Sequence, residues 1–120
     1  MAALATASVL LVAALHLGFL VLEMFLWKKP AGRRVFGLPP DVTAASAPLA
    51  ANQGLYNGFL AAGLLWSLTL GAAGVPVRVF FLVCVVVAGA FGAATATRSI
   101  LWVQALPGAV ALALTLVASR

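Results

Sequence analysis

Four long apolar runs take up most of this 120-residue chain and constrain its fold more than any other feature. Each run approaches the ~20 residues that a helix needs to cross a hydrocarbon core of ~30 Å. With 65% hydrophobic and only 8% charged residues, the chain departs far from the roughly 25% charged composition of soluble domains. We therefore expect an all-α, polytopic membrane protein. The runs cover residues 2–27, 49–70, 75–97 and 99–118.

The connections between these runs predict one bundle. A long loop, residues 28–48, follows the first run, and the other loops are short, which forces antiparallel neighbours. The economical architecture is a four-transmembrane-helix, up-down-up-down bundle, with residues 1–120 forming a single integral membrane domain. Ser46 and Pro48 are interpreted as the cap and the first turn of the second helix.

Basic residues are divided unevenly between the two sides of such a bundle, five against two. The positive-inside rule then places the first and third loops in the cytoplasm and both termini outside the cell inner (plasma) membrane. We interpret the net charge of +5 as this bias, with a weak attraction to anionic membrane lipids, and we expect no nucleic-acid partner. The five are Lys28, Lys29, Arg33, Arg34 and Arg98; Arg78 and Arg120 are the two.

Small residues recur at every fourth position in two of the runs, which indicates close helix packing in lipid. Gly54 and Gly58 share one side of the second run, and Gly89 and Gly92 belong to similar patterns in the third. These patterns could join helices within one chain or join copies in a homo-oligomer. Pro107 predicts a bend in the fourth helix, because its ring frees a backbone carbonyl.

The second run begins with four hydrogen-bonding side chains, Asn52, Gln53, Tyr56 and Asn57. At 100° per residue they span a single arc of about 140° beside the glycine pattern. Glu23 is the one acidic residue in any apolar run. An ionisable group in that setting is a functional-site hypothesis by default.

The predicted topology brings polar side chains from several helices to one depth. Glu23 precedes the end of the first helix by roughly 6 Å at 1.5 Å per residue, and the polar arc enters from the same side. Because a bilayer penalises each unsatisfied polar group, this favours a hydrated or ligand-filled pocket near the cytoplasmic leaflet, with His16 as its floor. The outer halves of the helices are expected to be mostly apolar. The predicted ligand-binding residues are Glu23, Asn52, Gln53, Tyr56, Asn57, Arg98, Gln104, Trp27 and Trp102.

Several functions remain open for such a pocket. The first is binding of a small amphipathic or hydrophobic molecule. The second is a membrane-embedded isomerase or hydratase-like enzyme with His16 and Glu23 as an acid–base pair, although their Cα atoms would be ~10.5 Å apart. An oligomeric transporter or channel-like subunit, or an assembly partner for another membrane protein, is also possible. In a purely structural interpretation, Glu23 pairs with Arg98 or Lys28.

Metal and cofactor chemistry is not expected. One His, one Cys and one intramembrane Glu fall short of a zinc ligand set. The chain also has no nucleophile elbow and no phosphate-binding loop. Cys84 is the only cysteine, so no disulfide is expected.

Five short motifs occur in the order "HLGFLVLEMFLW", "GRRVFGL", "ANQGLYNGFLAAG", "GAFGAAT" and "VQALPG". With them, the chain resembles a family of small bacterial four-helix membrane proteins catalogued as domain of unknown function thirteen hundred and four. The resemblance covers nearly the whole chain, and the Asn-Gln-Gly-Leu-Tyr-Asn-Gly stretch is its most specific part. It implies the fold and the membrane location, and it implies no activity. The residues that carry it are His16, Glu23, Met24, Trp27, Asn52, Gln53, Tyr56, Asn57 and Gln104.

Overall fold

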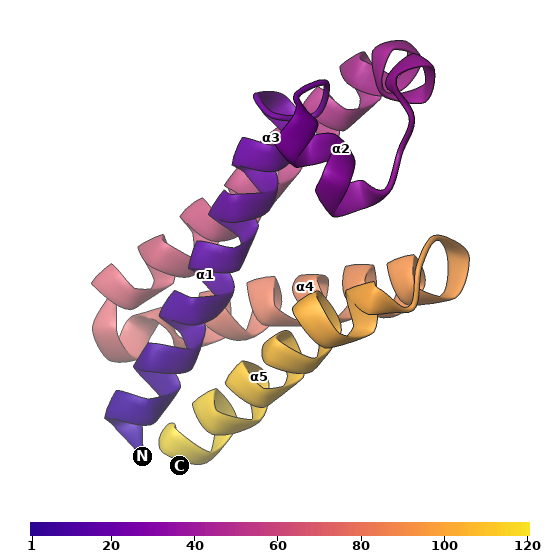
Figure 1. Ribbon diagram of the computed structural model, residues 1–120. Helices are drawn as coiled ribbons and strands as arrows, with labels where there is room; N and C mark the ends of the chain where they lie inside the picture. Colours follow the sequence, from indigo (N-terminus) through magenta and orange to yellow (C-terminus); the bar gives the residue numbers. More distant parts are fainter. The chain divides into compact units, whose positions relative to one another are not determined.

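The computed structural model describes all 120 residues, and it consists of helices joined by short connections, without a β-strand (Figure 1). The prediction of an all-α fold is therefore confirmed. In chain order the elements are α1 (Ala2–Met24), α2 (Pro30–Phe36), α3 (Pro40–Thr69), the 3-10 helix η1 (Gly71–Gly74), α4 (Val75–Thr95), the π-helix η2 (Leu101–Ala105) and α5 (Leu106–Ala118).

Three helical segments are long and apolar enough to cross a membrane, as expected for a membrane-embedded protein: Ala2–Met24, Gly71–Thr95 and Leu101–Ala118. The prediction of four such helices is met in part, because α3 is not among them. α3 is 30 residues long and Asp41 is its only charged residue, so neither length nor charge sets it apart. The difference is its lower mean hydropathy, because polar side chains occupy the start of its apolar run.

The second predicted helix begins nine residues before its apolar run, at Pro40 instead of residue 49. Proline suits a first helical turn, because its φ is fixed and its missing N–H would have no partner there, and Asp41 complements the helix dipole. Pro48 consequently lies inside α3. Ser46 is not its cap, since the Ser46 hydroxyl donates to the Val42 carbonyl at 2.7 Å. The prediction was wrong because hydropathy marks the edge of the lipid and not the end of backbone hydrogen bonding.

Much of the predicted loop, residues 28–48, is thus helical. Gly37 caps the C-terminus of α2; its φ of 64° is a left-handed conformation, and its N–H bonds to the Arg33 carbonyl. Trp27 lies at the start of this segment: its indole Nε1 donates to Ser46 Oγ at 3.0 Å, and its ring centroid is 4.7 Å from that of Phe36. One tryptophan therefore connects the end of α1 to both α2 and α3.

The chain divides into two compact units. Unit 1 consists of Met1–Leu15 and Leu60–Arg120, and unit 2 of His16–Phe59. α1 and α3 are each divided between the two units. The core of unit 1 is entirely aliphatic: Val9, Val12, Ala13, Ala61, Leu64, Leu82, Val85 and Ala111.

Within unit 1, α4 and α5 lie side by side (orange and yellow in Figure 1). Gly89 of α4 is buried against η2, where an added Cβ would lie 2.7 Å from the Ala105 backbone nitrogen. Gly92 similarly faces Ile100. These small-residue contacts join helices of the same chain.

The π-helix η2 directly precedes the proline of the last helix. The Leu106 N–H bonds to the Leu101 carbonyl, five residues back, and Pro107 lies in the first turn of α5. Proline removes a donor from the helical ladder, and a π turn is a common local adjustment of an α-helix. The distortion predicted at Pro107 is therefore present as a wide turn just before it.

Candidate functional site

Glu23 and Asn57 meet in unit 2. Glu23 is the penultimate residue of α1, and Asn57 lies in α3. The Asn57 Nδ2 donates to Glu23 Oε2 at 2.7 Å, a length typical of a charge-assisted hydrogen bond. Both side chains are partly buried.

The two glycines of α3 explain why this contact forms. A Cβ at Gly54 would lie 2.6 Å from Met24 Cγ and 3.2 Å from the Leu20 carbonyl oxygen, and one at Gly58 would lie 2.6 Å from Leu20 Cδ1. Glycine therefore permits an approach of α3 to α1 that a larger residue would prevent. Asn57 lies between these glycines in the sequence, so its amide reaches α1. These two glycines thus contact a helix of the same chain, and assembly into a homo-oligomer stays a prediction.

Each partner keeps an uncommitted acceptor. Glu23 Oε1 and Asn57 Oδ1 accept no hydrogen bond, and Glu23 forms no ion pair with Lys28. The structural interpretation that pairs Glu23 with Lys28 is thus not realised. In chemical terms, the site offers two oxygen acceptors, and the second N–H of the Asn57 amide is a free donor.

The other three members of the polar arc do not join this contact. Asn52, Gln53 and Tyr56 are exposed, and the Tyr56 ring packs edge-on to Phe59 with centroids 6.0 Å apart. On the helical wheel, Asn57 is the member of the arc nearest to Gly54, about 60° away. Only the edge of the arc beside the glycines therefore faces α1.

His16 and Trp27 both have structural contacts. His16 is fully buried, and its ring packs edge-on to Phe19 with centroids 5.6 Å apart. The indole N–H of Trp27 is used by Ser46, so it is not available to orient a ligand. The acid–base role predicted for His16 with Glu23 stays a prediction, and no contact of either residue adds support to it.

Arg98, Trp102 and Gln104 belong to unit 1. Arg98 is exposed between α4 and η2, and Trp102 is 65% exposed. Gln104 Nε2 donates to the Val85 carbonyl at 3.4 Å, a long hydrogen bond from η2 to α4. Their participation in a common site with Glu23 stays a prediction.

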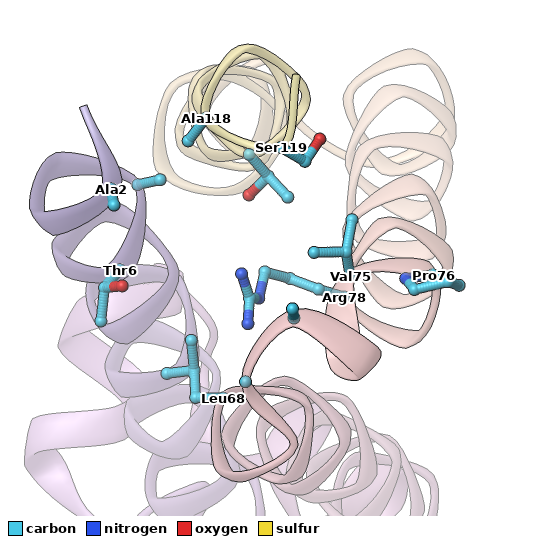
Figure 2. Close-up of a pocket in the computed structure, with 12 residues that line it drawn as sticks. Ala2, Thr6, Leu68, Val75, Pro76, Arg78, Ala118 and Ser119 are labelled. Carbon is cyan, nitrogen blue, oxygen red and sulfur yellow. The ribbon is translucent and has the colours of Figure 1, made fainter.

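A cavity of about 720 Å³ in unit 1 is a feature that sequence reasoning missed (Figure 2). It is lined by the ends of several helices and contains Arg78. In the sequence, Arg78 was interpreted only as a charge that contributes to topology. The surrounding helix ends were expected to be apolar. The signal that could have revealed it is a basic residue in the first turn of an apolar helix, with Thr6 and Thr115 near the ends of two others.

Comparison with known proteins gives a family and no activity. No match to the chain was found among curated proteins or among solved structures. One family model matches residues 10–116, a range that contains Glu23, Asn57 and Arg78. The chain therefore belongs to the family described as Protein of unknown function (DUF1304), the domain of unknown function thirteen hundred and four.

Proposed function

We propose that this protein binds a small amphipathic molecule within the membrane, with Glu23 and Asn57 holding the polar end. One observation carries the proposal: the 2.7 Å hydrogen bond orients the Glu23 carboxylate while Glu23 Oε1 and Asn57 Oδ1 remain uncommitted. A carboxylate held in an apolar helix without a counter-charge is costly. A ligand that supplies donors would offset that cost.

The free groups define the chemistry of the ligand. The Asn57 amide commits one of its two N–H groups to Glu23, so free oxygen acceptors outnumber free donors at the site. A polar end that donates, as an amine or a hydroxyl does, therefore satisfies most of the free groups. An amine gains most, since its charge complements the carboxylate. The hydrocarbon part would extend along the apolar face of α1, where Leu20 and Met24 already border α3.

The uneven distribution of basic residues supports a location for this site. If the segment with Arg33 and Arg34 is cytoplasmic, then Glu23, at the adjoining end of α1, lies near the cytoplasmic leaflet of the inner membrane. Ligands would reach it from that leaflet.

The experiment compares three alkyl compounds of equal chain length, an amine, an alcohol and a carboxylic acid. Each is added to protein purified in a nonionic detergent, and the thermal unfolding midpoint is followed. We expect stabilisation in the order amine, alcohol, acid. Glu23→Gln should raise the half-saturating concentration of the amine about tenfold, because a hydrogen bond to a charged group is lost.

The matched control is Gln53→Ala, which removes an exposed amide from the same arc of α3. Its response to the amine should equal that of the wild-type protein. Equal stabilisation by all three compounds, or the same loss in Gln53→Ala as in Glu23→Gln, would show that the compounds only partition into the detergent micelle.

A further inference from the structure

The cavity of unit 1 surrounds a guanidinium group that is only partly used. Arg78 Nε lies 3.4 Å from Ser67 Oγ, and Nη2 donates to the Ser67 carbonyl at 3.1 Å. Arginine has five N–H donors, so both N–H groups of Nη1 and one of Nη2 remain. Figure 2 shows the guanidinium between Thr6 of α1, Leu68 of α3 and Ser119, the residue that follows α5.

No acidic side chain in the same unit balances this charge. Glu23 and Asp41 are the only acidic residues of the chain, and both belong to unit 2. Arg78 forms no ion pair. A partly buried cation without a counter-ion favours an anion from outside the chain.

A buried hydroxyl in the cavity lining also lacks a partner. Thr115 lines the cavity and is 2% exposed, and its Oγ1 has no hydrogen bond. Helical hydroxyls usually bond to a carbonyl of the preceding turn, as Thr69 does to Trp66 and Thr95 does to Phe91. Thr115 does not, although a buried polar group without a partner is costly. Its hydroxyl is therefore a second uncommitted donor in the wall of the cavity.

A purely structural role for Arg78 explains only part of this geometry. Ser67 lies near the end of α3, where carbonyls lose their helical partners, and Arg78 caps one of them. That cap occupies a minority of the Arg78 donors. It accounts neither for the cavity nor for the unpaired Thr115 hydroxyl.

We infer that this cavity is an oxyanion-binding site in which Arg78 and Thr115 hold a phosphate group. The volume of about 720 Å³ lies within the ~300–1,000 Å³ of ligand pockets. Apart from Arg78, Thr115, Thr6 and Ser119, the lining is made of Ala, Gly, Leu, Val and Pro side chains. Such walls suit the phosphate of an anionic lipid headgroup, and free phosphate shares the same chemistry. The site is independent of Glu23.

The test measures the thermal unfolding midpoint in a nonionic detergent as a function of added phosphatidylglycerol, phosphatidylcholine or inorganic phosphate. A short C-terminal extension moves the α-carboxylate away from Arg120, so that it cannot act as the counter-ion. We expect phosphatidylglycerol to stabilise the protein and phosphatidylcholine to do so far less. Stabilisation by inorganic phosphate would identify a site for the free anion. Stabilisation by phosphatidylglycerol without any by inorganic phosphate would identify a site for the lipid headgroup.

Variants separate this site from general charge attraction. Arg78→Gln should raise the half-saturating concentration of phosphatidylglycerol at least about tenfold, and Thr115→Val about threefold, as expected for losing a charged and a neutral hydrogen bond. The matched control is Arg98→Gln, which removes the same charge from an exposed position of the same unit and should bind as the wild-type protein does.

Three outcomes would overturn the inference: wild-type binding in Arg78→Gln, an equal loss in Arg98→Gln, or stabilisation by neither phosphatidylglycerol nor inorganic phosphate. If Arg78→Gln does not fold because its cap on Ser67 is lost, Thr115→Val decides the question. It leaves both Arg78–Ser67 contacts in place, so unchanged binding in that variant contradicts the proposal.

Discussion

Replacing Gly89 with alanine should loosen the contact between α4 and η2. An added Cβ would lie 2.7 Å from the Ala105 nitrogen and 2.9 Å from both its Cα and its Cβ. Carbon atoms in ordinary contact are ~3.5–4.0 Å apart. Since these neighbours are backbone atoms and a Cβ, no rotamer change can relieve the clash, and the two segments have to separate by about 1 Å.

The cost follows from two opposing effects. Overpacking of a close contact costs about 1–3 kcal/mol, while alanine gains about 0.5–1 kcal/mol over glycine in a helix. Gly89→Ala should therefore be destabilised by about 1–2 kcal/mol. Gly18 is the matched control, because a Cβ there meets no atom within 4 Å. Gly18→Ala should therefore be stabilised by the helix propensity of alanine, without an overpacking cost.

The assay is reversible unfolding in mixed micelles with increasing sodium dodecyl sulfate, followed by circular dichroism. We expect the two variants to differ by about 2 kcal/mol in free energy of unfolding, with Gly18→Ala the more stable. If Gly89→Ala matches or exceeds Gly18→Ala, the close contact of α4 with Ala105 does not exist in the membrane protein.

Three further perturbations test local contacts by thermal unfolding. A double-mutant cycle of Glu23→Ala and Asn57→Ala should give a coupling energy of about 0.6–1.7 kcal/mol, as for hydrogen bonds in bilayers; additive effects would contradict the contact. Trp27→Phe should cost about 1 kcal/mol, and its cost should nearly vanish in a Ser46→Ala background, because the Trp27–Ser46 hydrogen bond is then already lost; an undiminished cost would argue against that bond. Gly37→Ala should cost about 1 kcal/mol since φ is 64°, and Gly37→Asn less; an unaffected Gly37→Ala would exclude that backbone conformation.

Run length predicted α1, α4 and the η2–α5 segment well, because each is an apolar stretch whose backbone has to bond internally in lipid. The start of α3 was missed for a physical reason. Hydropathy reports which solvent surrounds a residue, whereas the helix start depends on backbone geometry, for which Pro40 and Asp41 were the available signals.

The candidate site was predicted in part. Angular position placed Asn52, Gln53, Tyr56 and Asn57 on one arc, but which of them reaches Glu23 depends on how closely α3 approaches α1. That approach is set by side-chain contacts at the glycines, which a helical wheel does not contain.

The Arg78 cavity lay beyond sequence reasoning for another reason. Its lining joins Ala2 at one end of the chain with Ser119 at the other, together with the α3–α4 connection. No local pattern in the sequence predicts contacts between residues so far apart along the chain.

The central claim is that Glu23 and Asn57 hold the polar end of an amphipathic ligand. A photoreactive alkyl amine with its reactive group next to the nitrogen tests this most directly, in protein reconstituted into lipid. We predict labelling concentrated around Glu23 on α1 and Asn57 on α3, and lost in Glu23→Gln. Labelling spread evenly over the lipid-facing residues, or unchanged in Glu23→Gln, would contradict the claim and leave the Glu23–Asn57 hydrogen bond as a helix-packing contact.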